Sequence, residues 1–223
     1  MSPRGRLILF LLGGAGVAVL FVLGTVDLPG FGGAWHPYGE RTLPNAIRRH
    51  TPNVVSSINF DQRAFDTLGE ELILMASALA AVVVLRDVRE ETAGSHAYGP
   101  AEVFDALRIT GYLLLPVTLV AGVYIVAHGY LSPGGGFQGG IVLGSAIHLI
   151  YLAGDYPALA RVRPIPMFES GEAVAAGAFV LLALAAAGQV TAMSAAVGLE
   201  VGCAVVLVLA KFFEQALPVR TSE

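Results

Sequence analysis

The sequence predicts an all-α polytopic membrane protein with about six transmembrane helices. Hydrophobic residues make up 55% of the 223 residues. Charged residues make up 13%, against roughly 25% in a typical soluble domain. Several apolar runs are long enough to cross a bilayer as helices, and polar or Pro/Gly-rich segments separate them. We therefore expect helices packed in lipid, with the connections at the two membrane surfaces.

The first expected span is the apolar run Leu7–Leu23, which follows Arg4 and Arg6. Basic residues followed by an apolar core are also typical of a secretory signal peptide, so removal of residues 1–24 stays an alternative. The run is long for a signal peptide and no clear cleavage site follows it, which favours a retained helix. A polar segment rich in Pro and Gly then leads to the second span.

The second span is expected at Leu72–Leu85, extended backwards to Leu68 because the apolar run alone is short for a bilayer. Thr67 and Glu70 have the spacing of a capping box, in which side chains satisfy free amide donors at a helix start. Glu70 would then mark the beginning of this helix. Its neighbour Glu71 is expected in the headgroup layer.

The last four spans are expected at about Ala106–Ala127, Phe137–Ala153, Glu172–Ala187 and Ala195–Phe213. Pro116 should kink the first of them, because proline cannot donate a hydrogen bond to the preceding turn. Asp155–Glu172 contains charges and prolines and is expected to be a link. Gly188–Thr191 is expected to break the long uncharged stretch that follows.

A glycine-rich turn, HGYLSPGGGFQGG at His128–Gly140, joins the third and fourth spans. A proline followed by glycines cannot continue a helix, so the two spans should meet in a tight hairpin. Gly136, Gly140, Gly144 and His148 fall four residues apart, which places small residues along one helix face and allows close helix approach in lipid. The expected structural motif consists of Pro133, Gly134, Gly135, Gly136, Phe137, Gln138, Gly139, Gly140 and Gly144.

Ionisable side chains at membrane depth are energetically costly and are candidates for function. The candidates for an ion path are Glu70, His128, His148 and Glu200. Each also has a structural interpretation: a helix cap, an interfacial anchor, a hydrogen bond to a neighbouring helix, and a polar partner for another subunit, respectively. Lys211 is expected to reach the membrane surface with its amino group. These groups are too few for a complete path across the bilayer, which favours an accessory subunit.

Several other functions are disfavoured by the sequence. The net charge is −4 and the basic residues are scattered, so nucleic-acid binding is not expected. The single cysteine, Cys203, cannot form a CxxC metal site, and no His/Cys cluster, Walker A sequence or G-x-S-x-G motif is present. We expect no catalytic residues, no metal and no cofactor, and we do not expect an enzyme.

The distribution of basic residues predicts the orientation. If the N-terminus lies in the cytoplasm, most basic residues fall on the inner side and the His128–Gly140 turn faces outward, as the positive-inside rule requires. The inner residues would be Arg4, Arg6, Arg86, Arg89, Arg108, Arg161, Arg163, Lys211 and Arg220. The expected location is a prokaryotic plasma or inner membrane.

The segment from Pro116 to Gly140 closely resembles the signature of the MnhB/MrpB-type subunit of the Mrp-type multisubunit cation/proton antiporters. The resemblance continues through Gly198–Gly202 and covers about Asp105–Leu217. Tyr130 departs from the pattern, since the family often has histidine there. The substitution removes a titratable group and weakens any role for a histidine pair in the turn.

The preceding segment, Thr51–Glu70, is similar to the end of the large MrpA-type subunit and to small subunits of membrane-bound hydrogenases. The matching residues are Asp61, Arg63, Asp66, Thr67 and Glu70. The chain therefore resembles a fusion of a two-helix module, residues 1–92, and a four-helix module, residues 93–223. The junction would lie near Arg89–Tyr98.

These resemblances imply an accessory membrane subunit of a Na⁺/H⁺ antiporter complex, packed against larger subunits and lining part of an ion path. The implied partners are the other membrane subunits of the same hetero-oligomer and the lipid bilayer, with Na⁺ and H⁺ as transported ions. An equivalent subunit of an ion-translocating redox complex, such as a membrane-bound hydrogenase, stays open. So does a purely structural packing module.

Overall fold

The computed structural model describes residues 2–26, 28, 36–85, 104–162, 164–185 and 188–216. Its secondary structure is helical, with no strand in these ranges. The chain divides into two compact units, Met1–Glu40 and Arg41–Glu223. The all-α prediction is thus confirmed.

The first unit contains α1 (Pro3–Val26). This helix has 24 residues and the highest mean hydropathy among the candidate spans, 2.6. It covers the expected first span, Leu7–Leu23, and extends it by several residues at both ends.

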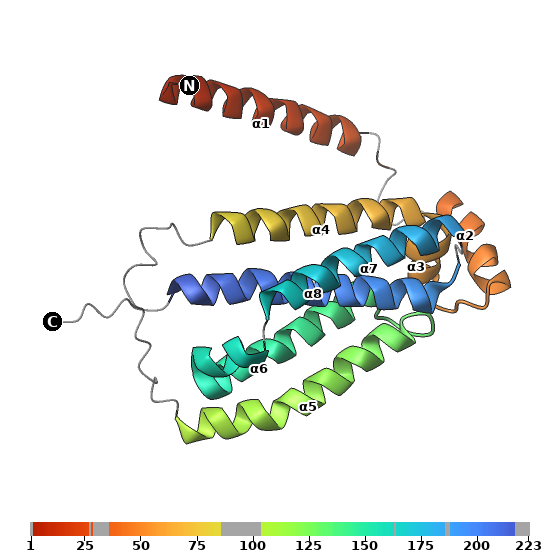
Figure 1. The fold of residues 1–223 in the computed structure, drawn as a ribbon. Helices are drawn as coiled ribbons and strands as arrows, with labels where there is room; N and C mark the ends of the chain where they lie inside the picture. Colours follow the sequence, from red (N-terminus) through yellow and green to blue (C-terminus); the bar gives the residue numbers. More distant parts are fainter. Residues whose placement is uncertain are drawn as a thin grey trace. The chain divides into compact units, whose positions relative to one another are not determined.

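The second unit is a bundle of five long helices (Figure 1). They are α4 (Ala64–Val84), α5 (Asp105–His128), α6 (Gly136–Val162), α7 (Ile165–Ala185) and α8 (Val190–Ala216). Each contains a segment long and apolar enough to cross a membrane, so with α1 the described part of the chain has 6 candidate spans. This agrees with the predicted number.

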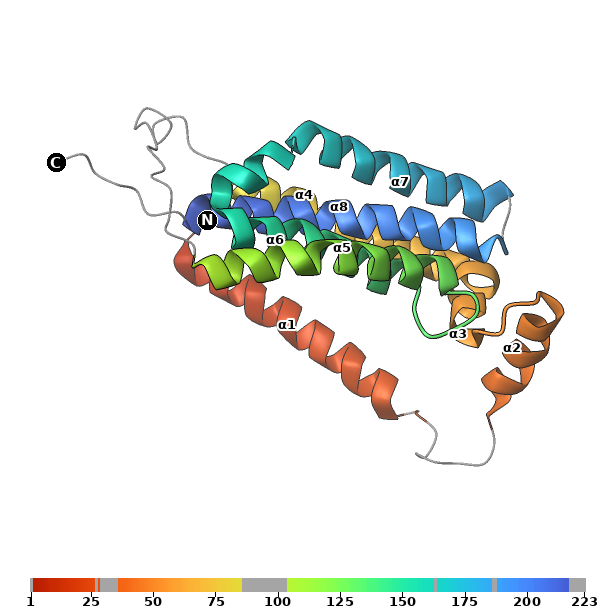
Figure 2. The ribbon, with the colours of Figure 1, turned by 90° about the horizontal axis from the view of Figure 1, so that it is seen from below.

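Helix α8 is the centre of this bundle and packs against α4, α5, α6 and α7. Its membrane-length segment is 67% buried, whereas none of the other segments exceeds 39%. Figures 1 and 2 show α4, α6 and α8 running in one direction and α5 and α7 in the other. Polar groups carried by α8 are therefore the ones most shielded from lipid.

The end of the bundle at which α4 and α8 begin is here called the cap end. It carries the α5–α6 turn, the short helix α3 (Val54–Ser57) and a π-helical turn, η1 (Ile58–Gln62) (Figure 1). A hydrophobic core extends from η1 into the bundle, with Phe60 packed edge-on against Phe179 at 6.3 Å between ring centroids. Its buried members are Phe60, Ala64, Phe179, Val190, Met193, Ala196, Val197 and Val201.

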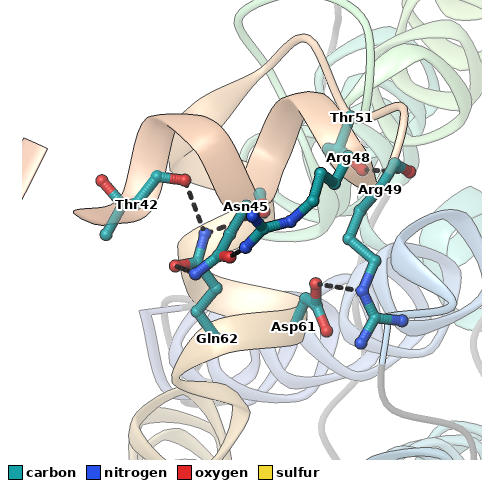
Figure 3. Close-up of polar contacts among 8 residues, drawn as sticks. Thr42, Asn45, Arg48, Arg49, Thr51, Asp61 and Gln62 are labelled. Atoms are coloured by element: carbon teal, nitrogen blue, oxygen red, sulfur yellow. Dashed lines mark hydrogen bonds and ion pairs between the residues drawn. The ribbon is translucent and has the colours of Figure 1, made fainter. Parts of the chain in front are cut away.

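Polar contacts connect α2 (Pro37–Arg48) to η1 (Figure 3). The Gln62 amide donates to the carbonyl of Thr42 at 3.2 Å, and the Asn45 amide donates to Gln62 at 3.4 Å. Arg49 pairs with Asp61 at 3.5 Å between Nε and Oδ2. These bonds fix the C-terminal part of α2 on the cap end.

Two local predictions were wrong. Helix α4 begins at Ala64, so Thr67 lies inside the helix and does not cap it. Its hydroxyl donates to the carbonyl of Asn59 at 2.8 Å, and Glu70 is exposed. The expected link Asp155–Glu172 consists instead of the end of α6 and the start of α7, since both helices continue well into it.

The predicted module junction near Arg89–Tyr98 lies outside the described residues. Helices from both sides of it share one bundle, because α4 packs against α7 and α8. Helix α5 is continuous through Pro116, and α8 begins at Val190, within the expected break.

Candidate ion-path site

The turn between α5 and α6 is as tight as the sequence predicted. Gly134 and Gly135 have φ angles of +147° and +139°, a region that side chains with a Cβ rarely adopt. A Cβ on Gly129 would lie 2.7 Å from the Cα of Gly135. Backbone geometry alone therefore requires glycine at Gly129, Gly134 and Gly135.

Asn53, which caps α3, holds this turn from outside. Its side-chain amide donates to the carbonyls of Gly129 at 2.7 Å and Ser132 at 2.8 Å. Its backbone amide donates to Tyr130 at 3.1 Å, and the Ser56 hydroxyl donates to Gly129 at 2.5 Å. The polar segment before α4 therefore satisfies the carbonyls that the turn leaves free.

The glycine stripe of α6 lies directly against α8. A Cβ on Gly136 would lie 2.5 Å from Cβ of Val197, one on Gly140 2.7 Å from Val201, and one on Gly144 2.9 Å from Val205. All three positions are too close for any side chain. The pairs repeat every four residues on both helices, so the stripe forms the close contact that its spacing predicted.

The other motif residues have different neighbours. Gly139 faces Val126 of α5, so α6 has glycines on two faces. Phe137 packs against the hydrophobic core. Gln138 and Pro133 are exposed.

Glu200 is fully buried in α8, and it meets acidic side chains from two other helices. Glu71 of α4 is also fully buried, and its carboxyl group interacts directly with that of Glu200. Glu172 of α7 is 2% exposed and lies within electrostatic reach of Glu200. We call Glu71, Glu200 and Glu172 the acid row.

The acid row has few polar neighbours. Apart from each other, the carboxyl oxygens of Glu71 and Glu200 have no hydrogen-bond partner among the described residues. One carboxyl oxygen of Glu172 is likewise buried without a partner among them. Burying unsatisfied carboxyl groups costs several kcal/mol and is seldom retained for stability alone.

Further acidic groups flank the row. Glu70 acts electrostatically on Glu71 and Glu169 on Glu172, and both flanking residues are exposed. Cys203 of α8 lies near both Glu172 and Glu200, where Gly171 lets α7 approach its sulfur. Five acids therefore follow one another: the exposed Glu70, the buried Glu71, Glu200 and Glu172, and the exposed Glu169.

The predicted candidates are only partly brought together. Glu200 is in the acid row, but Glu70 is beside it on the exposed face of α4. His148 is buried on α6, where its ring contacts Phe213 edge-on at 5.6 Å. His128 ends α5 and stacks on Tyr124 at 4.0 Å.

Sequence reasoning placed Glu71 in the headgroup layer and Glu172 at the end of a link, although helical periodicity could have found both buried acids. The buried residues of α4 are Ala64, Thr67, Glu71 and Ala78, and those of α7 are Glu172, Ala175, Ala176 and Phe179. Both sets follow the spacing of one helix face. In the described ranges no group of three or more His, Cys, Asp or Glu side chains is arranged to hold a metal ion.

Residues 106–217 match the family described as "Domain related to MnhB subunit of Na+/H+ antiporter". The chain is 30% identical over 115 residues to an uncharacterized protein of Methanocaldococcus jannaschii. That alignment covers 46% of this chain, and the chain spans only 44% of the length of that relative.

Two solved structures share the fold. A chain of the membrane-bound sulfane sulfur reductase, described as an archaeal respiratory membrane complex, aligns with a TM-score of 0.69 at 23% identity. The alignment covers 93% of this chain and 98% of that one. A chain of the Mrp complex from Dietzia sp. aligns with a TM-score of 0.64 at 21% identity, covering 95% of this chain and 26% of that one.

Proposed function

Because this chain belongs to the family of domains related to the MnhB subunit of Na⁺/H⁺ antiporters, we propose that it is a membrane subunit of a multisubunit monovalent cation/proton antiporter. The observation that carries the proposal is Glu200. It is fully buried at the centre of the bundle, in the part of the chain that matches the family, and it contacts a second buried acid. Such groups at membrane depth commonly mark ion pathways.

In this proposal the chain works inside a larger assembly. The α5–α6 hairpin is locked onto α8 by the glycine stripe, which gives the bundle a rigid shape. Helix α5 has only Gly111 and Gly122 buried, so most of its apolar surface faces outward and is available to larger subunits or lipid. The subunit would lie in the plasma or inner membrane with its N-terminus in the cytoplasm and its cap end outside.

The experiment starts from the complex in its native membrane. A tagged chain, extracted in mild detergent, should co-purify with larger membrane subunits. Vesicles that contain the complex should release an imposed proton gradient when Na⁺ is added, and vesicles from cells without this chain should not. A chain that purifies as a solitary monomer would contradict the proposal.

The second candidate is the equivalent subunit of a redox-driven ion pump. The fold shared with a chain of an archaeal respiratory complex supports it, although at 23% identity this likeness concerns the fold alone. The two candidates differ in their companions. Co-purification with iron–sulfur or other redox subunits, and ion movement driven by electron transfer, would favour this version.

A further inference from the structure

We propose that the acid row Glu71–Glu200–Glu172 is a proton relay built into this chain, and not a site that binds the transported cation. The inference rests on the proposed transport function. Of the two transported ions, it assigns the proton to the acid row. It also replaces the expectation that this chain holds too few ionisable groups for a path of its own.

The row is placed to carry protons along the membrane normal. Glu71 lies seven residues, or about 10 Å, from the cap-end start of α4. Glu200 lies ten residues, or about 15 Å, from the start of α8. Glu172 lies thirteen residues, or about 20 Å, from the cap-end terminus of α7. Counted from the cap end along their own helices, the three acids therefore follow one another, with Glu200 in the middle.

The exposed acids continue this order. Glu70 stands beside Glu71 toward the cap end, and Glu169 stands one helical turn beyond Glu172 in the other direction. Each is exposed and acts electrostatically on its buried neighbour. The buried row thus has an exposed carboxyl group beside each end.

The ligand geometry favours a proton over a metal cation. Among the described residues, no group of three or more His, Cys, Asp or Glu side chains is arranged to hold a metal ion, so the three acids do not converge on one point. Glu71 and Glu200 have no other hydrogen-bond partner in the described ranges. Two buried carboxylates in contact cannot both stay charged, but one protonated carboxyl group can donate to the other. A single shared proton therefore satisfies this pair.

The transfer is balanced at each step. Protonated Glu71 gives its proton to the carboxylate of Glu200, which leaves Glu71 as the carboxylate and Glu200 as the acid. Glu200 then protonates Glu172, directly or through one water molecule that accepts one proton and donates another. Glu172 releases this proton through Glu169, which returns Glu172 to the carboxylate, and Glu71 takes up the next proton from the cap end through Glu70.

The first test uses the complete complex in vesicles with two readouts. Proton flux is followed with an internal pH dye, and Na⁺/Na⁺ exchange is followed with radioactive Na⁺ under conditions without net proton movement. In Glu200→Gln and in Glu172→Gln, proton flux should fall by about 100-fold, as expected when a positioned proton carrier is lost, with Na⁺/Na⁺ exchange unchanged. Glu200→Asp should restore part of the flux, and Asp66→Asn, an exposed acid on α4, is the matched control.

Two results would overturn the relay. Equal loss of proton flux and Na⁺ exchange would make the row a cation site, and normal flux in all the glutamine variants would make it structural. Failure of the wild-type complex to show any Na⁺-dependent proton movement would instead count against the proposed function. Failure of the relay and failure of the proposed function therefore give different results.

A second measurement does not depend on transport or on the assembly of variants. Dicyclohexylcarbodiimide reacts with protonated carboxyl groups in apolar surroundings, and mass spectrometry locates the product. At neutral pH the wild-type complex should be labelled at Glu71 or Glu200, and added Na⁺ should not protect it. Absence of labelling at both residues, or protection by Na⁺, would contradict a shared proton.

Discussion

The side-chain amide of Asn53 donates to the backbone carbonyl of Gly129 at 2.7 Å, and this bond joins two segments that lie 76 residues apart. Asn53 also caps α3, with its oxygen accepting from the amide of Ser56. One residue therefore orders the start of α3 and closes the α5–α6 turn. The turn is held in shape by a segment outside its own hairpin.

Replacing Asn53 by alanine should destabilise the cap end. The variant removes the donor to the carbonyl of Ser132 and one of the two donors to the carbonyl of Gly129, which keeps the Ser56 hydroxyl, at a cost of about 0.5–1.5 kcal/mol for each lost hydrogen bond. The measurement is the midpoint of thermal unfolding of the detergent-solubilised complex. Asn45→Ala, which removes a longer bond to Gln62, is the control and should have a smaller effect. Equal midpoints for the two variants would argue against a role for Asn53 in holding the α5–α6 turn.

Gly140→Leu should prevent α6 from packing on α8, because even a Cβ at this position would lie 2.7 Å from Val201. We expect loss of the assembled complex in size-exclusion chromatography. Gly177→Leu on α7, where nothing lies within 4 Å of an added Cβ, should assemble normally. The smaller substitution Gly140→Ala should also impair assembly, and combining it with Val201→Ala should restore part of that assembly. Normal assembly of Gly140→Leu would show that the stripe is not a tight contact.

Replacing Glu71 and Glu200 together by methionine should raise or preserve the thermal unfolding midpoint while abolishing proton transport. When both partners of a buried polar pair are replaced by apolar groups of similar volume, the change is often neutral or stabilising, by up to about 4 kcal/mol. Thermal unfolding and proton flux would be measured on the same preparation. A purely structural role for Glu200 predicts the opposite result, with a lower midpoint and unchanged transport.

Gly188→Ala and Gly69→Ala should have opposite effects on stability. Gly188 has φ of +94°, and its added Cβ would lie 3.1 Å from Oδ1 of Asp61, so alanine should destabilise by about 1 kcal/mol. Gly69 lies inside α4 with open space around it, so alanine should stabilise the helix by about 0.8 kcal/mol. The two midpoints of chemical unfolding would be compared with the wild type. A shift of the same sign would contradict the assigned backbone geometry.

The sequence predicted the elements that depend on local signals. Long apolar runs determined the number of spans, and the spacing of Gly136, Gly140 and Gly144 predicted the close contact with another helix. The PGGG segment predicted a turn, and two of its glycines, Gly134 and Gly135, take positive φ. Each of these features is encoded within a short stretch of the chain.

The acid row could not be predicted in the same way, since it requires three helices to meet. The prolines and charged residues of Asp155–Glu172 indicate a link between spans. Glu172 was therefore not expected at membrane depth. The Thr67/Glu70 spacing drew attention to Glu70, whereas the buried member of the Glu70–Glu71 pair is Glu71. Periodicity on α4 separates the two, because Glu71 shares a face with Thr67 and Ala78, whereas Glu70 does not.

The contact between Glu71 and Glu200 unites opposite halves of the polypeptide, one acid from α4 and the other from α8. Neither half on its own possesses this contact. The proposed proton transfer from Glu71 to Glu200 therefore becomes possible only after α8 has been made and has packed against α4.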